Sequence, residues 1–242
     1  MPSADREAPE LLPVAVLLGG RGTRLGELAR DTPKALVPVA GEPFVFHQLR
    51  LLARQGARRV VLCVGHLGER IVDAVGDGAR FGLEVEYAFD GPELLGTAGA
   101  LRGASHRLGE RFLVTYGDAY LRADHRAVQV AFLRSGLPGL MTVVRNEDRW
   151  VPSNAVFVDG LVIAYDKRVP PPEARCVDYG LLAFDSRVFV EHDDADLSDV
   201  CRALAARGAL GGLLVHERFY EIGTPEGLAE ADAFLRDAQG RG

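Results

Sequence analysis

The fold is decided by Pro13-Val14-Ala15-Val16-Leu17-Leu18, which runs directly into Gly19-Gly20-Arg21-Gly22-Thr23-Arg24-Leu25. The first part is short, apolar and ends at paired glycines, which is typical of a buried strand in a parallel sheet. The second part combines glycines with a hydroxyl and two guanidiniums. Glycines let a ligand approach backbone N–H groups closely, and arginine donates forked hydrogen bonds to phosphate. The segment therefore predicts a strand that leads into a phosphate-binding loop.

Strand and helix patterns alternate through the first half of the chain. Helices are expected at 43–55, 68–75 and 97–108, and Thr97 is expected to cap the last of them. Strands are expected at 60–64, 83–87 and 112–116, of which 83–87 alternates polar and apolar residues and should be half-exposed. This β-loop-α alternation predicts an α/β fold with a Rossmann-like sheet, mixed but mostly parallel, flanked by helices.

The second half is richer in strands. The pattern predicts strands at 140–145, 154–158, 161–165, 177–184 and 212–216, with helices at 126–134, 197–206 and from Pro225 onward. Asp159-Gly160 lies between two apolar runs and is a strong hairpin signal. No linker or internal repeat interrupts the chain. We therefore expect one domain over residues 1–242, with a nucleotide-binding half at about 11–120 and a β-rich half at about 121–242.

Composition narrows the class of protein. The 242 residues are 48% hydrophobic and 26% charged, with a net charge of −6. This is an ordinary composition for a globular domain, and the acidic balance argues against broad binding to nucleic acid or a membrane surface. Three widely spaced cysteines do not predict a disulfide framework, and no segment reaches transmembrane length. A cytoplasmic location is the expectation.

Two common phosphate-binding motifs are absent. The dinucleotide fingerprint requires a glycine where Leu25 stands, and a P-loop requires Gly-Lys before Ser or Thr, a pair that the chain lacks. The sequence therefore supports neither a dinucleotide-dependent dehydrogenase nor a Walker-type NTPase.

The loop at 19–25, taken with Asp31-Thr32-Pro33-Lys34-Ala35-Leu36-Val37-Pro38-Val39-Ala40-Gly41, closely resembles the signature of sugar-1-phosphate nucleotidyltransferases, the NDP-sugar pyrophosphorylases. The resemblance implies their fold, with a β-rich sugar-binding insertion. It also implies their reaction, in which an NTP and a sugar 1-phosphate give an NDP-sugar and pyrophosphate. Arg24 and Lys34 would be catalytic, and the nucleotide would contact Leu18, Gly19, Gly20, Gly22 and Thr23. Leu18 stands where the family often has a small residue, which would tighten the base pocket.

Later segments resemble the same family. Glu93-Leu94-Leu95-Gly96-Thr97-Ala98-Gly99-Ala100 implies that Gly96 and Thr97 contact the nucleotide. Tyr116-Gly117-Asp118 implies that Asp118 is catalytic as a Mg²⁺ ligand. Glu221 stands where the family commonly has an aspartate that completes the Mg²⁺ site, and glutamate is also a hard oxygen ligand. For the sugar phosphate, the resemblance implies contacts from Asn154, Asp166, Lys167, Tyr179 and Gly180.

Substrate identity stays open at this level. The arrangement of these segments is most similar to the mannose- and heptose-1-phosphate guanylyltransferase branch, which implies GTP with heptose or mannose 1-phosphate. Uridylyl, cytidylyl or thymidylyl transfer to another sugar or cyclitol phosphate is an alternative. Phosphocholine-type and molybdopterin-type transferases are others, and so is a non-catalytic nucleotide-sugar-binding regulatory protein. We expect a monomer or homodimer without an appended hexapeptide-repeat domain.

Overall fold

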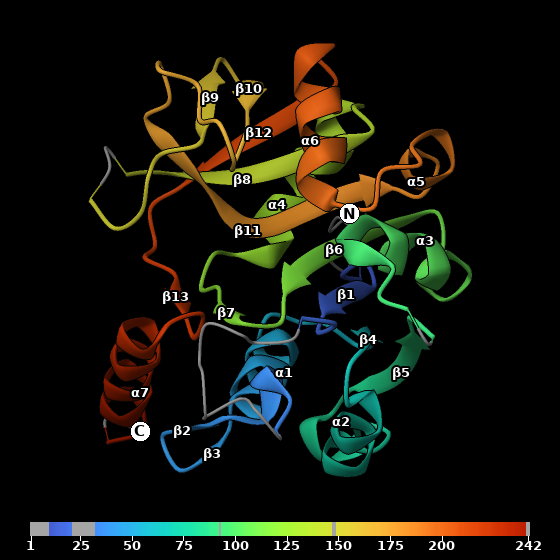
Figure 1. Cartoon of the computed structure of the whole chain (residues 1–242), viewed down its shortest axis with the longest axis vertical. Coiled ribbons are helices and arrows are strands. Elements are labelled where there is room, and N and C mark those ends of the chain that lie inside the picture. Colours follow the sequence, from blue (N-terminus) through green and yellow to red (C-terminus); the bar gives the residue numbers. More distant parts are fainter. Residues whose placement is uncertain (1–9, 21–31, 92, 147–148, 241–242) are drawn as a thin grey trace, which may run out of the picture.

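The computed structural model describes residues 10–20, 32–91, 93–146 and 149–240. Its centre is a nine-stranded mixed sheet with the strand order β5-β4-β1-β6-β11-β8-β12-β10-β9 (Figure 1). This confirms the predicted α/β fold. The strands are β1 (Val14–Leu17), β4 (Arg59–Val64), β5 (Glu84–Phe89), β6 (Arg111–Tyr116), β8 (Gly139–Arg145), β9 (Ala155–Val158), β10 (Leu161–Tyr165), β11 (Cys176–Asp185) and β12 (Leu210–Val215).

The first apolar run forms the middle of the parallel part of the sheet. β1 lies between β4 and β6 and is parallel to both, and β5 extends the parallel set beyond β4. Val14, Ala15 and Val16 are completely buried, as expected for a strand that is covered on both faces. Because these four strands run in the same direction, their carboxyl ends lie along one edge of the sheet.

The second part of the sheet mixes directions. β11 is antiparallel to β6 on one side and to β8 on the other, while β8 and β12 are parallel. The predicted hairpin joins β9 to β10. Asp159 and Gly160 at its tip have φ values of 46° and 81°, the left-handed conformations that a tight hairpin turn requires.

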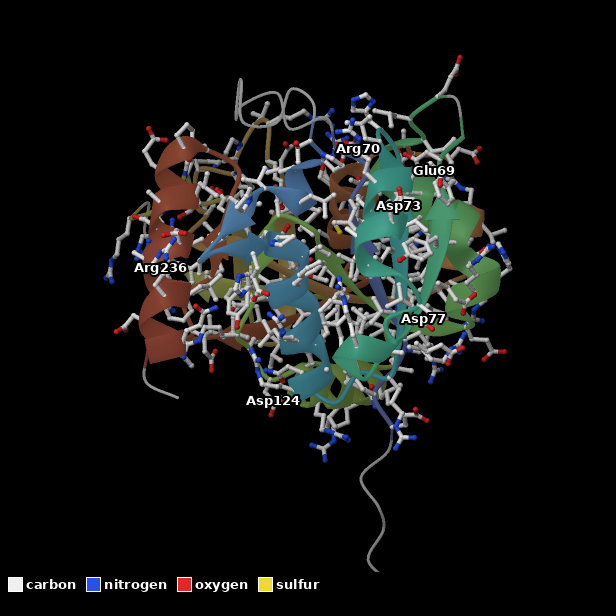
Figure 2. All side chains as sticks on the ribbon, turned by 90° about the horizontal axis from the view of Figure 1, so that it is seen from below. Glu69, Arg70, Asp73, Asp77, Asp124 and Arg236 are labelled. Carbon is white, nitrogen blue, oxygen red and sulfur yellow. The ribbon has the colours of Figure 1, made fainter. Side chains whose placement is uncertain are left out.

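Helices cover both faces of the sheet. The core on one face is built with α1 (Phe44–Arg54), α2 (Gly68–Val75) and α4 (His125–Ser135). The core on the other face is built with α3 (Gly96–Leu108), α5 (Val188–Glu191) and α6 (Leu197–Ala206). On α2, the exposed Glu69 and Asp73 point away from the sheet while Ile71 is buried (Figure 2). Each helix therefore buries an apolar stripe of the kind that the sequence pattern predicts.

The end of the chain returns to the first half. The short strand β13 (Tyr220–Glu221) pairs with β7 (Ala119–Tyr120), and α7 (Pro225–Gly240) lies beside β2 (Pro38–Val39) and β3 (Glu42–Pro43) (Figure 1). Asp232 of α7 accepts a hydrogen bond of 2.6 Å from the backbone N–H of Ala40. Residues near the C-terminus therefore reach the part of the sheet that carries the first motif. Among the described helices, none is both long and apolar enough to cross a membrane.

Candidate active site

A cavity of about 390 Å³ opens at the carboxyl ends of the parallel strands. Ligands of open α/β sheets bind at this edge, because the loops after the strands diverge there. The walls come from the segments that follow β1, β5 and β6, from the start of α3 and from the segment around Lys34. The lining residues are Leu17, Leu18, Gly19, Gly20, Lys34, Ala35, Asp90, Leu94, Gly96, Thr97, Ala100, Tyr116, Gly117, Asp118 and Gly223.

The cavity brings together much of the predicted nucleotide site. Its walls contain Leu18, Gly19, Gly20, Lys34, Gly96, Thr97 and Asp118. The predicted roles of Gly22, Thr23 and Arg24 concern positions outside the described residues. Glu221 and the five predicted sugar-phosphate residues do not line the cavity.

Lys34 and Asp118 form an ion pair at the cavity wall. The Lys34 ammonium donates to Oδ2 of Asp118 over 2.6 Å, although the two residues are 84 positions apart. Lys34 opens a short 3₁₀ helix, Lys34–Leu36, directly after Pro33, and Asp118 follows β6. Their side chains are 13% and 31% exposed, so solvent and ligands can reach the pair. A cation and a carboxylate that are this accessible can each exchange the other for a phosphate or a metal ion.

Gln48 fixes the turn that carries Asp118, a role that the sequence reading missed. Its amide nitrogen donates to the backbone carbonyls of Tyr116 and Ala119 over 2.8 and 3.0 Å, one on each side of Asp118. Gln48 is 2% exposed and lies on α1 among apolar neighbours. The sequence did contain a signal for this role, namely a glutamine on an otherwise apolar helix face. Such a side chain is expected to be buried, and buried polar groups are normally hydrogen-bonded.

Leu18 and Gly117 depend on one another. A Cβ atom at Gly117 would lie 2.0 Å from Cδ2 of Leu18 and 2.7 Å from the carbonyl oxygen of Leu17. A side chain at position 117 would therefore collide with the end of β1. This explains why a glycine precedes Asp118, and it places the Leu18 side chain at the β6 side of the cavity.

Glu221 lies on a strand next to Asp118 without lining the cavity. Glu221 is paired with Ala119 across the β7–β13 ladder, and the N–H of Ile222 donates to the carbonyl of Asp118 over 2.9 Å. In the described part of the chain, no group of three His, Cys, Asp or Glu side chains could hold a metal ion by itself. Mg²⁺ commonly takes one or two carboxylates and completes its shell with substrate phosphates and water. Asp118 supplies one such carboxylate at the cavity wall, and Glu221 lies on the strand that pairs beside it.

The start of α3 differs from the prediction. The helix begins at Gly96 and its N-cap residue is Leu95, so the expectation that Thr97 caps this helix is wrong. Gly96 has a φ of 76°, and a Cβ there would lie 2.4 Å from the carbonyl oxygen of Ala195. That same carbonyl accepts the N–H groups of Ala98 and Gly99 over 2.8 and 3.4 Å. The chain therefore turns into the helix one residue earlier, against a segment from the second half.

Thr97 ties α3 to α6. Its hydroxyl accepts a hydrogen bond of 2.7 Å from the N–H of Leu197 and donates to the Asp196 carboxylate over 3.3 Å. Leu197 is the first residue of α6, so Thr97 satisfies a backbone donor at the beginning of that helix. Thr97 lines the cavity, and it also joins the two halves of the chain.

Lys167 forms the second lysine–carboxylate pair of the site. Its ammonium lies 2.8 Å from Oδ2 of Asp178 and 3.4 Å from the hydroxyl of Tyr116, whose ring lines the cavity. Burial alone would lower the pKa of Lys167, but the Asp178 carboxylate and Tyr116 raise it above its ordinary value. The Asp178 side chain is 1% exposed and also accepts a hydrogen bond of 3.1 Å from Tyr165. Lys167 therefore lies behind Tyr116, charged and already paired.

The other predicted sugar-phosphate residues bind groups within the protein. Oδ1 of Asn154 accepts from the N–H of Asp178 over 3.0 Å, and the Tyr179 hydroxyl accepts from the N–H groups of Arg122 and Ala123 over 2.9 and 3.2 Å. Gly180, with a φ of 94°, donates to Asp178 over 2.9 Å at an irregularity in β11. Such an irregularity bends a strand and can redirect a side chain. Here it helps to aim the Asp178 carboxylate at Lys167.

Asp166 is held by its own loop. Oδ1 accepts from the N–H groups of Arg168 and Val169 over 2.7 and 2.9 Å, and these donors lower the pKa of Asp166. Its other oxygen lies 3.3 Å from the guanidinium of Arg202 on α6. The carboxylate thus holds the turn that follows Lys167.

Comparison with known proteins agrees with the fold and the motifs. A family model described as "Nucleotidyl transferase" matches residues 14–151. Mannose-1-phosphate guanylyltransferase of Mycobacterium tuberculosis is 27% identical over 238 residues, covering 91% of this chain and 63% of that protein. Glucose-1-phosphate thymidylyltransferase of Streptomyces griseus is 40% identical over 107 residues, covering 44% of this chain and 30% of that protein. The chain thus spans less than two thirds of either relative.

A solved structure extends the fold comparison. The crystal structure of HddC from Yersinia pseudotuberculosis is similar with a TM-score of 0.78 at 23% identity, covering 93% of this chain and all of that chain. The family match covers more than half of the chain, and the cavity assembles residues from that segment at the predicted sheet edge. The chain therefore belongs to the nucleotidyl transferase family.

Proposed function

We propose that the protein transfers a nucleotidyl group from a nucleoside triphosphate to a sugar 1-phosphate and releases pyrophosphate. The observation that carries this proposal is the accessible Lys34–Asp118 pair at the wall of a cavity of about 390 Å³. A polyphosphate needs a fixed cation, and a transferred phosphoryl group is commonly bound through Mg²⁺ on a carboxylate. The pair supplies both kinds of group at the end of a parallel sheet.

The chemistry needs no protein nucleophile. An oxygen of the sugar phosphate attacks the α-phosphorus and forms a new P–O bond, while the bond from the α-phosphorus to the α–β bridging oxygen breaks. That electron pair leaves with the pyrophosphate. The Lys34 ammonium stabilises the negative charge on the phosphates, and the loop at Gly19 and Gly20 lets the triphosphate approach the backbone. Lys167, behind Tyr116, provides positive charge on the side from which the sugar phosphate enters.

Asp118 and Glu221 would hold the Mg²⁺ ion. When bound, Mg²⁺ would neutralise phosphate oxygens and bring the two polyanionic substrates together. Lys34 holds the Asp118 carboxylate in place at the cavity wall. The Lys34 ammonium would contact the phosphates instead if Asp118 served as a ligand of the ion.

We assign GTP and mannose or heptose 1-phosphate as the preferred substrates. A relative named as a mannose-1-phosphate guanylyltransferase aligns with 91% of the chain, and HddC has been solved in complex with GMP-PN. Relatives named for thymidylyl and uridylyl transfer also match, over 44% and 62% of the chain. Transfer of another base to another sugar phosphate is therefore the second candidate.

A pyrophosphate-release screen tests the proposal. GTP, UTP, CTP, dTTP and ATP are each combined with mannose, glucose, heptose and aminosugar 1-phosphates, with Mg²⁺ or with EDTA. We expect release only when both substrates and Mg²⁺ are present, with the highest kcat/KM for GTP and mannose or heptose 1-phosphate. If nucleotides bind at equilibrium but no pair releases pyrophosphate, the protein is a binding protein and the proposal is wrong.

A further inference from the structure

Asp90 is an acidic residue in the wall of a cavity that we propose binds a polyanion. It follows β5, and its N–H donates to the carbonyl of Val64 at the end of β4 over 3.0 Å. Gly19 follows β1 and Asp118 follows β6, so the strand order places Asp90 and Asp118 at opposite ends of the parallel edge. At about 4.8 Å per strand, three spacings separate them by roughly 14 Å. The Asp90 backbone therefore lies at the end of the edge away from Lys34 and Asp118, and its carboxylate reaches back across β4 toward Gly19.

The walls around Asp90 are otherwise backbone and apolar side chains. A Cβ built at Gly19 would lie 3.1 Å from Oδ2 of Asp90, and one at Gly65 would lie 3.0 Å from it and 2.7 Å from Cδ2 of Leu94. The carboxylate and the Leu94 side chain thus cover two glycines. A slot lined by glycine backbone and leucine suits a flat aromatic ring.

The Asp90 carboxylate keeps acceptor capacity for a ligand. Burial raises the pKa of Asp90, partly offset by the N–H of Leu95, which donates to the carboxylate. Within the described ranges, no lysine, arginine or histidine forms an ion pair with it. An ionised carboxylate can accept about four hydrogen bonds, so one backbone donor leaves most of this capacity unused. A partly buried carboxylate in that state favours a ligand with neutral N–H donors.

Guanine offers the best-matched set of donors among the common bases. Its N1–H and N2 amino group are adjacent on one edge and can donate in parallel to the two oxygens of a carboxylate. Adenine and cytosine each place a ring acceptor beside their amino group. Uracil and thymine place N3–H between two carbonyl oxygens, which a carboxylate repels. A partly buried carboxylate in the base slot therefore favours guanine and disfavours every other common base.

We propose that Asp90 is the residue that selects the base, by accepting hydrogen bonds from N1–H and N2–H₂ of guanine. The inference rests on the proposed function and deepens it, because it names the residue behind the preference for GTP. Leu94 and the backbone at Gly19 form the faces of the slot, and the triphosphate extends along the sheet edge toward Lys34. A site that is built to accept two donors discriminates strongly against an analogue that lacks one of them.

Inosine triphosphate isolates this interaction, because hypoxanthine differs from guanine only by the missing N2 amino group. We expect the wild-type protein to prefer GTP over ITP by about 10- to 100-fold in kcat/KM, the range for a hydrogen bond to a charged group. Asp90→Asn keeps the size of the side chain and an acceptor for Leu95, but it replaces one acceptor oxygen with a donor. In that variant the GTP-to-ITP ratio should fall to within about threefold of unity.

Glu84→Gln is the matched control, since Glu84 is an exposed carboxylate at the opposite end of β5. Its GTP-to-ITP ratio should equal that of the wild type, and thermal melts of both variants verify folding. Equilibrium binding of GTP and ITP is measured in parallel. If no nucleotide pair turns over but Asp90→Asn still abolishes discrimination in binding, the proposed function fails and the base assignment stands. Preference for a pyrimidine triphosphate, or a GTP-to-ITP ratio that Asp90→Asn leaves unchanged, overturns the assignment.

Discussion

The two sides of the candidate site hold their lysines in different ways. On the nucleotide side, Lys34 and Asp118 form a pair whose side chains are 13% and 31% exposed. On the sugar side, Lys167 is bound to a carboxylate that is only 1% exposed and that two further groups, Tyr165 and Gly180, also hydrogen-bond. Both lysines can be reached by a ligand, since the Lys167 side chain is 39% exposed, but the two carboxylates differ. The Lys34–Asp118 pair is therefore exchangeable at both ends, whereas the buried Asp178 carboxylate is fixed and holds Lys167 in place at its surface.

Both of these positions carry lysine rather than arginine. Lys34 and Lys167 are the only lysines in the chain, and every other permanently basic side chain is an arginine. An ammonium is a compact point charge, while a guanidinium is a larger planar fork. Lys34 starts a tight 3₁₀ turn, and the Lys167 ammonium lies 4.7 Å from the centre of the Tyr116 ring. Both sites therefore place a compact point charge beside a carboxylate.

The largest effect should come from breaking the exchangeable pair. Lys34→Gln and Asp118→Asn should each lower kcat by about 10²- to 10³-fold or more, because each removes a charge that stabilises the transferring phosphoryl group. Both side chains are partly exposed, so thermal stability should change by less than about 1 kcal/mol. Steady-state pyrophosphate release and thermal melts measure the two effects. A variant with wild-type turnover would remove its residue from the mechanism.

The second largest effect should be a loss of stability when the Lys167–Asp178 pair on the sugar side is broken. Lys167→Met leaves the buried Asp178 carboxylate without its cation, so the free energy of unfolding should fall by about 1–3 kcal/mol. The double variant with Asp178→Asn removes the stranded charge and should recover part of that loss. Chemical denaturation of the two single variants and the double variant measures the coupling. Equal stability of Lys167→Met and the wild type would show that this pair, too, is exchangeable.

The described residues predicted for the nucleotide side lie together at one cavity because their motif is local. Leu18, Gly19 and Gly20 follow one strand directly, and the paired glycines and the strand end indicate a phosphate loop without knowledge of the rest of the fold. The role of Asp118 was inferred from the resemblance of Tyr116-Gly117-Asp118 to a family segment that also follows an apolar strand. A strand end in a parallel sheet fixes the position of the next residue, so chemistry can be predicted from a few neighbouring positions.

The remaining parts depend on contacts between distant segments. Gln48 acts on backbone groups 68 and 71 positions away, and Asp166 pairs with Arg202, 36 positions away. Asn154 was predicted to contact the sugar phosphate, but its side-chain oxygen accepts a hydrogen bond from the backbone N–H of Asp178. Nothing in the local pattern distinguishes a polar side chain that meets a ligand from one that meets another strand. Asp90 lines the same cavity, but no motif in the sequence singled it out, because a lone aspartate after a half-exposed strand has no local pattern that points to a ligand.

The smallest effect tests Thr97, a residue that contacts both sides. Thr97 lines the cavity, and its hydroxyl also accepts the N–H of Leu197 and donates to Asp196. Thr97→Val keeps the shape but strands that backbone donor, so the free energy of unfolding should fall by about 1 kcal/mol, whereas Thr97→Ser should stay close to wild type. If the main role of the hydroxyl is to hydrogen-bond Leu197 and Asp196, KM for the triphosphate should change less than twofold in both variants. That change corresponds to about 0.4 kcal/mol or less. A large rise in KM for Thr97→Val with unchanged stability would instead make Thr97 a direct nucleotide ligand, and the start of α3 would then be tied to the second half by the Ala195 carbonyl, which accepts the N–H groups of Ala98 and Gly99.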